Sequence, residues 1–224
     1  MIQDLHSHTW YSACGRDEME TVIETALAGG IELLGISDHN YGIGNRKQEY
    51  LQDIQEMKKK YEGRIRLLRG IEIATLPGKG PENPKDIAEF DYCLIEHIDE
   101  SESVLGADII RYAEESPIPV GIAHTDLFGF SEKMGIAPLT LLSMFHERGI
   151  FWEMNVNYDS IHKYREHKYV KAFLENREML DIVKKSGIRL SVGFDGHRAE
   201  DYLPERVIRM NRYLEENGVK KMFE

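Results

Sequence analysis

The chain has few cysteines, no long apolar stretch and no segment that resembles a linker. Its 224 residues include only Cys14 and Cys93, which are too few for a disulfide framework. No apolar run approaches the roughly 20 residues of a membrane-spanning helix, and the N-terminus opens into a strand pattern without a basic-then-apolar signal. Because no Pro/Gly/Ser-rich segment divides the sequence, we expect a single domain over residues 1–224, no membrane partner and a cytoplasmic location.

Basic residues are also in short supply. Lysine and arginine total 28 against 39 aspartates and glutamates, and the formal net charge is −11. This charge argues against broad non-specific binding to extended nucleic acid or to an anionic membrane. It leaves open a short nucleic-acid substrate held by metal ions. We expect a small phosphorylated substrate as the partner, and the sequence predicts no particular oligomeric state.

Short apolar runs with a strand pattern recur along the chain, and segments with helical spacing separate them. The runs begin at Ile2, Leu33, Ile65, Tyr92, Pro119, Ile150 and Arg189. The helical segments cover residues 17–28, 47–61, 84–89, 107–115, 138–148, 169–185 and 204–216. Strand and helix alternating this often favours parallel strands joined by right-handed crossovers. The predicted fold class is therefore α/β, with strands that end together at one face of a barrel.

These runs end in side chains of the kind that bind metal ions. The residues at the run ends are His6, His8, His39, Glu72, His97, His124, Glu153, Asp195 and His197. Neutral imidazoles and carboxylates are the usual ligands of zinc, manganese and iron, and a site needs several of them from separate segments. Any one of these histidines is explained equally well as a packed core residue. Their recurrence at equivalent points favours one shared metal site.

Spacing along the strands predicts which of these side chains share a cavity. Residues two apart on a strand point to the same face. His6 and His8 are therefore expected on one face of the first strand, and Asp195 and His197 on one face of the last. Both pairs can point into the same cavity.

Two acidic residues directly precede candidate ligands and are expected to face the other way. Asp38 comes before His39, and Glu96 comes before His97. Neighbouring residues on a regular strand point to opposite faces, so direct ligation by either acid is not expected. A contact with the outer N–H of a ligating imidazole stays open, because such imidazoles commonly donate that proton to a carboxylate or carbonyl.

Six sequence segments between Asp4 and His197 contain the candidate ligands. In chain order they are DLHSHT, ISDHN, LRGIE, CLIEHID, GIAH and GFDGH. In their residues and order they resemble the motifs of the polymerase and histidinol phosphatase (PHP) superfamily of metal-dependent phosphoesterases. The resemblance covers nearly the whole chain. It implies a distorted seven-stranded (β/α) barrel of the TIM-like PHP type, with two or three divalent ions (Zn, Mn or Fe) at the C-terminal ends of the strands. The count of seven apolar runs agrees with this implication.

The resemblance also implies a ligand set: His6, His8, Cys14, His39, Glu72, His97, His124, Asp195 and His197. Glu72 would bridge the first ion to a second one held by His97 and His124. In the family a histidine from the loop after the first strand helps to hold a third ion, and here Cys14 stands at that position. A thiolate can replace imidazole on zinc, so the third site either survives with an altered metal preference or is weakly occupied. Asp17 filling the site and a free thiol at Cys14 are the alternatives.

The expected function follows from this resemblance. Two ions about 3.5–4 Å apart lower the pKa of a bridging water toward about 7, so that hydroxide attacks phosphorus at neutral pH. Glu72 would fix the separation of the ions, and Asp195 and His197 are the candidates to protonate the leaving oxygen. We expect a phosphomonoesterase of the histidinol-phosphatase type. The alternatives are a phosphodiesterase or exonuclease acting on nucleotides or short nucleic acids, and a metal-binding module with little turnover, which the Cys14 departure motivates.

Positive and polar side chains near the predicted site are candidates to hold the substrate. Arg16 follows the first strand and Arg165 lies in the loop after the sixth, where a guanidinium can make charge-assisted hydrogen bonds to phosphate. Asn155 shares the face of the run-end acid on the sixth strand. We predict substrate contacts for these three residues, with a solvated surface charge as the alternative for the arginines. His162 and His167 are expected to be surface residues or substrate contacts, not ligands.

Overall fold

The computed structural model describes residues 1–223 and contains eight strands. They are β1 (Gln3–Asp4), β2 (Leu33–Ile36), β3 (Arg66–Arg69), β4 (Glu72–Ala74), β5 (Cys93–Glu96), β6 (Val120–Ile122), β7 (Phe151–Asn155) and β8 (Leu190–Gly193). One sheet has the order β1-β2-β3 and the other the order β4-β5-β6-β7-β8. Every pairing within the two sheets is parallel. The predicted α/β class with parallel strands is confirmed.

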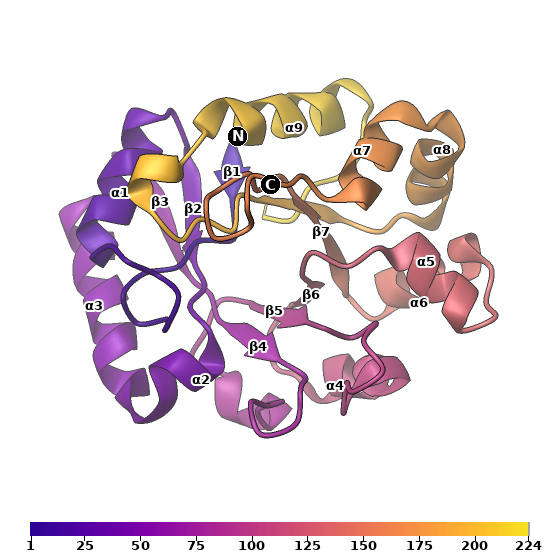
Figure 1. Cartoon of the computed structure of the whole chain (residues 1–224), viewed down its shortest axis with the longest axis horizontal. Coiled ribbons are helices and arrows are strands. Elements are labelled where there is room, and N and C mark those ends of the chain that lie inside the picture. The colour runs from indigo at the N-terminus through magenta and orange to yellow at the C-terminus, as the bar shows by residue number, and fades with distance from the viewer. Residues whose placement is uncertain (224) are drawn as a thin grey trace.

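Nine α-helices within residues 1–223 lie around these strands. They are α1 (Met19–Ala28), α2 (Asn40–Ile43), α3 (Lys47–Lys60), α4 (Ile109–Glu115), α5 (Leu127–Lys133), α6 (Pro138–Glu147), α7 (Lys168–Glu175), α8 (Arg177–Ser186) and α9 (Pro204–Glu216), with 3-10 turns η1 (Gly44–Arg46), η2 (Pro84–Ile87), η3 (Gly106–Asp108) and η4 (Ala199–Asp201). Figure 1 shows α1 and α3 on one side of the strands, α5 and α6 on the opposite side and α9 across the top. In the described part of the chain, none of the helices has the length and apolar character needed to cross a membrane.

The structure has eight strands in two sheets and not the seven of the predicted barrel, because one apolar run forms two strands. The run that begins at Ile65 pairs with β2 through β3, and then pairs with β5 through β4. The change of partner occurs at Gly70. A Cβ on Gly70 would lie 2.5 Å from Tyr92 Oη and 2.8 Å from the carbonyl oxygen of Ile36. The close approach therefore requires glycine, and the run breaks there into strands of different sheets.

Hydrogen bonds outside the two sheets also join the ends of their strands. The backbone N–H of Leu5 donates to Val192 O at 2.8 Å, and the N–H of Asp195 donates to His6 O at 2.7 Å. A parallel bridge also links His39 to Glu72. These contacts place the C-terminal ends of β1 and β8 beside each other, and the start of β4 beside the C-terminal end of β2.

An apolar floor lies beneath these strand ends. Its buried residues are Leu5, Leu33, Leu68, Tyr92, Leu94, Ala123, Phe151 and Met222. Leu94 and Phe151 come two residues before Glu96 and Glu153, so each acid lies on the same strand face as an apolar side chain. The polar residues at the strand ends therefore sit above a packed interior.

The helices match the predicted segments in part. The segment 204–216 is α9 with the predicted bounds, and 84–89 is only the short 3-10 turn η2. The single helix predicted over 169–185 is two helices, α7 and α8, because Asn176 has an extended backbone and caps α8 by accepting the N–H groups of Glu178 and Met179. An asparagine at that position stabilises a helix start. The short helices α2 and α5 were not predicted.

Candidate metal centre

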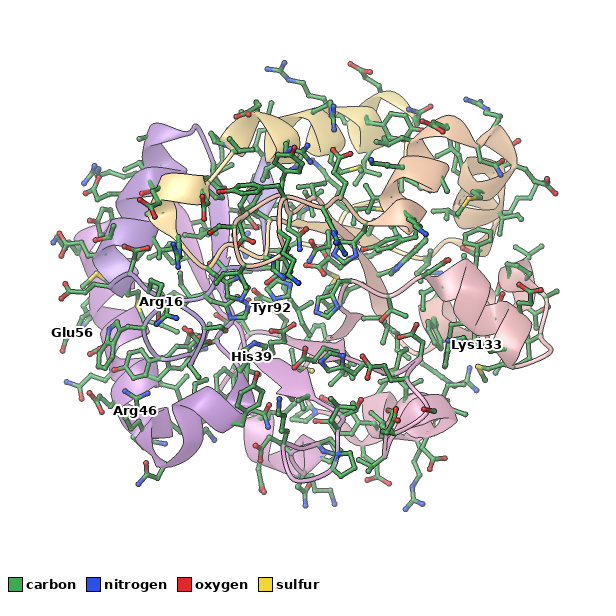
Figure 2. All side chains as sticks on the ribbon, in the orientation of Figure 1. Arg16, His39, Arg46, Glu56, Tyr92 and Lys133 are labelled. Atoms are coloured by element: carbon green, nitrogen blue, oxygen red, sulfur yellow. The ribbon has the colours of Figure 1, made fainter. Side chains whose placement is uncertain are left out.

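The ends of the strands bring a dense cluster of imidazoles and carboxylates together. Predicted ligands in the cluster are His6, His8, Cys14, His39, Glu72, His124, Asp195 and His197. One group with ligand atoms within 4.8 Å of one another is His6, His8 and Asp195, and another is His8, Cys14, His39 and His197. Figure 2 shows His39 near the middle of the molecule in this view, with Arg16 and Arg46 toward one side.

The ring of His6 is fixed by a buried carboxylate behind it. Its Nδ1 lies 2.8 Å from Glu153 Oε1, and the other oxygen of Glu153 accepts the backbone N–H of His124 at 2.8 Å. A Cβ on Gly193 would lie 2.0 Å from Glu153 Oε1 and 2.6 Å from the Cβ of His6, so glycine at this position makes room for the pair. Because Glu153 accepts, Nδ1 of His6 carries the proton and Nε2 has a free lone pair.

The ring of His8 is fixed in the same way by Ser12. The Ser12 hydroxyl donates to Asp38 Oδ1 at 2.7 Å and accepts the backbone N–H of His39 at 2.9 Å. The same hydroxyl oxygen lies 3.1 Å from Nδ1 of His8 and can accept a further hydrogen bond. Nδ1 of His8 is therefore the donor, and its Nε2 is also left with a lone pair.

These two Nε2 atoms face each other at 3.1 Å. Nε2 of His8 also lies 3.0 Å from Asp195 Oδ1, and Nε2 of His6 lies 3.2 Å from Glu72 Oε1. Ligand atoms on a tetrahedral zinc ion are separated by about 3.3 Å, given bonds of roughly 2.0–2.1 Å. Acceptors that converge at this spacing need a cation between them, so the donor set fits a divalent metal ion.

Without an ion, a proton has to occupy this gap. Burial alone would lower the pKa of His6, but the charges of Glu72 and Glu153 raise it well above its usual value. Burial and the charge of His197 lower the pKa of His8 to about 3. The pair therefore holds one proton at neutral pH, and a metal ion bound there displaces it.

Glu72 lies at the centre of the cluster and is 1% exposed. Its carboxylate oxygens lie 3.2 Å from His6, 3.4 Å from His8, 2.9 Å from His39 and 3.1 Å from His124. Burial raises the pKa of Glu72, but the charges of His6 and His39 hold it well below its usual value. Oε2 of Glu72 and Nδ1 of His39 are buried 2.9 Å apart without the alignment of a hydrogen bond. Two buried polar atoms that approach each other in this way are suited to share an ion.

Cys14 lies between two imidazoles. Nδ1 of His197 lies 2.9 Å from the carbonyl oxygen of Asp195 and donates to it, so Nε2 of His197 is free on the other side of the ring. Burial raises the pKa of the Cys14 thiol, but hydrogen bonds to His197 and His39 outweigh this effect and lower it to about 7. A thiol of this kind is readily converted to the thiolate that binds metal.

Three residues of the cluster have left-handed backbone conformations. His97 has φ 65°, His124 has φ 25° and Asp195 has φ 57°, and they follow β5, β6 and β8. Such conformations cost non-glycine residues about 1–3 kcal/mol each and gather at functional sites. The strain is consistent with side chains that are aimed at a common point.

Comparison with known proteins agrees with this geometry. A sequence model of the PHP domain matches residues 4–216. The chain belongs to the PHP family. The resemblance seen in the motifs is thus confirmed, and with it the assignment to a superfamily of metal-dependent phosphoesterases. No curated protein matches the sequence significantly.

Solved structures share the PHP fold at low sequence identity. Histidinol phosphate phosphatase from Lactococcus lactis subsp. lactis Il1403, complexed with zinc, L-histidinol and phosphate, is 14% identical with a TM-score of 0.66, covering 98% of this chain and 95% of that one. A putative histidinol phosphatase from Listeria monocytogenes is 15% identical with a TM-score of 0.59, covering 89% and 96%. A chain of an archaeal ribonuclease P with mature tRNA is 13% identical with a TM-score of 0.52, covering 94% and 89%. These likenesses show the fold.

The predicted PHP ligand His97 is placed differently from the others. Its Nε2 lies 2.7 Å from Glu96 and its Nδ1 lies 2.8 Å from Glu100. His124 does contact Glu72, and its ring centroid lies 6.0 Å from that of His97. The structure therefore brings His124 to Glu72 and leaves His97 at the edge of the cluster.

The expectation that Glu96 faces away from the site was wrong. Its carboxylate lies 3.3 Å from Nδ1 of His39 and forms a group of potential ligands with His39 and Glu72. Strand β5 ends at Glu96, and the left-handed conformation of His97 follows directly. The alternation of faces therefore stops at the strand end, and Glu96 keeps the inward face of Leu94.

Asp38 is held away from the ligand atoms, as predicted, and organises the loop that carries Cys14. Its buried carboxylate accepts the backbone N–H and the hydroxyl of Thr9 at 2.7 and 2.8 Å. It also accepts the backbone N–H of Ser12 at 3.0 Å. Through Ser12 it reaches His8, so this acid sets the position of a candidate ligand without touching it.

The predicted substrate contacts lie in two kinds of surroundings. Arg16 and Arg165 are exposed. Asn155 is buried, and its amide donates to Glu153 Oε2 at 3.2 Å and to Asp195 Oδ2 at 3.4 Å. Contact of these three residues with substrate stays a prediction.

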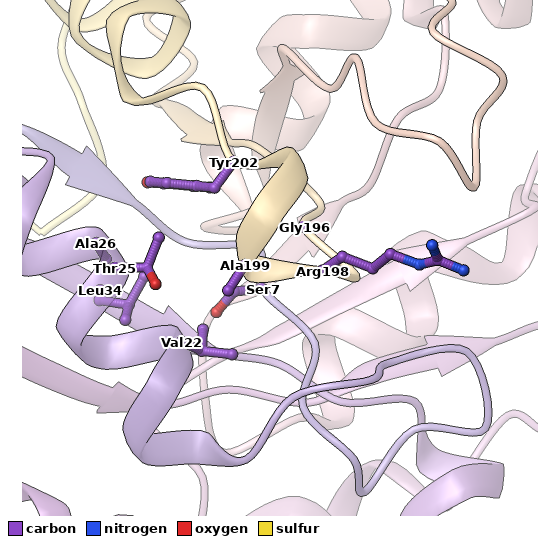
Figure 3. A pocket seen from close by; sticks show the side chains of 9 residues that line it. All are labelled: Ser7, Val22, Thr25, Ala26, Leu34, Gly196, Arg198, Ala199 and Tyr202. Carbon is purple, nitrogen blue, oxygen red and sulfur yellow. The ribbon is translucent and has the colours of Figure 1, made fainter.

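Sequence reasoning missed Asp159. This fully buried carboxylate accepts the Nδ1–H of His162 at 2.7 Å and the backbone N–H of His197 at 3.3 Å. A signal was present in the sequence, because Asp159 continues the two-residue spacing of Asn155 and Asn157 beyond the end of β7. A separate small pocket is lined by residues of α1 and of the 196–202 segment, together with Ser7 and Leu34. Figure 3 shows the Arg198 side chain extending away from the other lining residues.

Proposed function

We propose that this PHP protein hydrolyses small phosphate monoesters of the histidinol-phosphate type with two or three divalent ions. The observation that carries the proposal is the place of Glu72, whose buried carboxylate lies within 3.4 Å of four imidazoles. A carboxylate surrounded in this way can bridge two ions, as centres that activate water for attack on phosphorus require.

Three sets of side chains would hold the ions. The first is His6, His8, Glu72 and Asp195, the second is Glu72, His97 and His124, and the third is Cys14, His39 and His197. Zinc, manganese or iron bound in these sets supplies activation of water at neutral pH and neutralisation of phosphate charge. The thiol of Cys14 between two imidazoles supports zinc in the third set.

The residues of the chain then have separate tasks. Glu72 fixes the spacing of the site. Asp195 and His197, two and four residues beyond β8, are the proposed proton donors to the leaving oxygen, a task that either can perform only while it is not bound to an ion. Arg16 and Arg165 would bind the phosphate group of the substrate from the solvent side, since both side chains are exposed. Asn155 would orient Asp195 as well as substrate, since its amide reaches that carboxylate.

We also infer that the two sheets close into one distorted barrel and that residues 1–224 form a single PHP domain. The hydrogen bonds from β1 to the end of β8 and the bridge between His39 and Glu72 support closure. The apolar floor supports it as well, because six of its eight members lie in or directly follow six different strands. A closed barrel brings all strand ends to one mouth.

Two observations support a small monoester. The fold matches a histidinol phosphate phosphatase that was solved with zinc, L-histidinol and phosphate. The net charge of −11 disfavours an extended polyanion.

A second candidate, hydrolysis of a nucleotide or of the end of a short single strand, is favoured by the aromatic residues near the site. Tyr41 is 38% exposed and stacks on His39 at 4.7 Å, and Lys79 lies 4.8 Å from its ring. Trp10 is 44% exposed with Arg46 5.1 Å away. Aromatic rings paired with cations are surfaces on which nucleobases stack.

The test is hydrolysis of a panel of substrates after metal removal and reloading with zinc, manganese or iron. The panel contains histidinol phosphate, other small monoesters, bis-p-nitrophenyl phosphate and a short 5′-phosphorylated oligonucleotide. The products measured are phosphate from monoesters, p-nitrophenol from the diester and nucleotides from the oligonucleotide. We expect the monoesters to be hydrolysed fastest. Faster cleavage of the diester or oligonucleotide would favour the second candidate, and no release from any substrate with any metal would refute both.

A further inference from the structure

The loop after β7 carries a histidine that points into the metal centre from outside the predicted ligand set. Nε2 of His162 lies 3.4 Å from Asp195 Oδ2. Its ring centroid lies 5.1 Å from that of His197. The side chain is 29% exposed, so it lies between the solvent and the cluster. None of the three ligand sets proposed above includes it.

Asp159 fixes which nitrogen of His162 faces the site. Its Oδ1 accepts both the backbone N–H of His162 at 2.9 Å and the Nδ1–H at 2.7 Å. Its Oδ2 accepts the backbone N–H of His197 at 3.3 Å. With Nδ1 donating to a fully buried carboxylate, Nε2 presents a lone pair toward Asp195.

The contact between His162 and Asp195 then joins two acceptors. The other neighbours of Asp195 Oδ2 are the amides of Asn155 and Asn157, each at 3.4 Å, which is long for a hydrogen bond. A separation of 3.4 Å between a nitrogen lone pair and a carboxylate oxygen is close to the roughly 3.3 Å expected for two ligands on one tetrahedral zinc ion. Either a second proton on His162 or a metal ion therefore lies between the two atoms, and the spacing suits a metal ion.

The loop holds His162 through contacts on both sides of it. The backbone N–H of Ser160 donates to Asp201 at 3.2 Å, and the N–H of Tyr164 donates to Asp159 O at 2.9 Å. Lys163 and Tyr164 have left-handed φ angles of 57° and 54°, so the chain turns sharply directly after the histidine. A conformation that costs free energy and is pinned in this way indicates a built arrangement.

We propose that His162 is a further metal ligand, binding through Nε2 an ion shared with Asp195 Oδ2, and that Asp159 is the residue that positions it. The inference rests on the proposed metal-dependent function. It adds a ligand that comes from a loop and not from a strand end. Metal binding and the order of residues 158–164 are then coupled, because the ion ties the loop to β8.

Calorimetric titration of zinc into the metal-free protein tests the proposal. The variants are His162→Ala, Asp159→Ala and the control His146→Ala, which removes an exposed histidine of α6 near the opposite ends of the strands. We expect His162→Ala to lower the zinc affinity of one site by about 10–100-fold and Asp159→Ala to lower the affinity of the same site by a smaller factor. The affinities of His146→Ala should match those of the wild type. His162 is partly exposed, so its truncation leaves the core intact if Asp159→Ala fails to fold.

Limited trypsin digestion gives a second reading that does not depend on activity. Lys163, Arg165 and Lys168 are exposed in or beside the loop. We expect zinc to slow cleavage there in the wild type and in His146→Ala, and to give no protection in His162→Ala. Wild-type affinity and protection in His162→Ala would overturn the proposal, even if KM for a phosphate ester rose. A wild type that binds no ion at all would instead refute the proposed function.

Discussion

The two sides of the candidate metal centre differ in how firmly the proposed ligands are held. The inner side is His6, His8 and Asp195, whose side chains are 0%, 0% and 5% exposed. Glu153 and Ser12 occupy the Nδ1 atoms of the two histidines. The outer side is His97, His124 and Glu96. There the side chains of His97 and His124 are 28% and 19% exposed.

The difference lies in preorganisation. On the inner side every nitrogen that is not aimed at the ion position already has a partner, so binding orders little that is not ordered already. On the outer side both nitrogens of His97 face carboxylates, Glu96 and Glu100, and the ring has to turn to reach an ion beside Glu72. A rigid side suits a resident ion, and an adaptable, partly exposed side suits the place where substrate enters.

Glu72 joins the two sides, so its replacement should have the largest effect. For Glu72→Gln we expect the loss of at least one bound ion and a fall in kcat on the order of 10³-fold or more, since metal stabilisation of phosphoryl charge contributes several kcal/mol. Elemental analysis and steady-state kinetics measure both. Glu132→Gln, an exposed acid on α5, is the matched control. Full metal content and full activity in Glu72→Gln would show that Glu72 does not bridge two ions.

Removing one histidine from each side tests the difference between them directly. His8→Ala should weaken metal binding at least about tenfold more than His97→Ala, a difference of ~1.4 kcal/mol. The reason is that His8 is fixed before binding, whereas His97 gives up contacts with two carboxylates when it binds. Zinc titration monitored by calorimetry measures both affinities. Equal losses, or a larger loss in His97→Ala, would show that the outer side is as well preorganised as the inner side.

The same contrast explains which parts of the site could be predicted from the sequence. His6 and His8 follow β1 within four residues and Asp195 follows β8 by two, and the family motifs identify all three. The prediction for Glu96 failed because it was made relative to His97, whose left-handed backbone ends the alternation. Asp159 and His162 lie in a loop, whose turns depend on contacts such as that between Ser160 and Asp201. Contacts between residues about 40 positions apart leave no local pattern.

The fold divides in a similar way. The α/β class and the segment of α9 follow from periodicity alone. The break between β3 and β4 does not, because it depends on Tyr92 filling the space beside Gly70, and Tyr92 belongs to a different run. Asn176 splits 169–185 through a local capping signal that was available in the sequence, so that error was avoidable.

A smaller effect should come from the support behind the inner side. Ser12→Ala removes the group that accepts Nδ1–H of His8 and the N–H of His39. We expect the affinity for one ion to fall by about 10–100-fold, as is usual for residues behind metal-bound histidines, with the ion count kept at saturating zinc. Ser101→Ala, an exposed serine in the loop after β5, controls for loss of a hydroxyl. If Ser12→Ala binds zinc as the wild type does, the rigidity of the inner side has another origin.

The smallest effect is expected at Cys14, which lies beside the inner side and offers sulfur where the family has nitrogen. Thiolate favours zinc over manganese more strongly than imidazole does. Cys14→His should therefore lower the ratio of zinc to manganese affinity by about tenfold and change kcat by less than that. Competition dialysis followed by elemental analysis measures the ratio. Any zinc bound by the buried Cys93 of β5 contributes equally to both proteins, because both contain it. An unchanged ratio with an unchanged ion count would place Cys14 outside the ligand set, and the thiol between His39 and His197 would then be a free one.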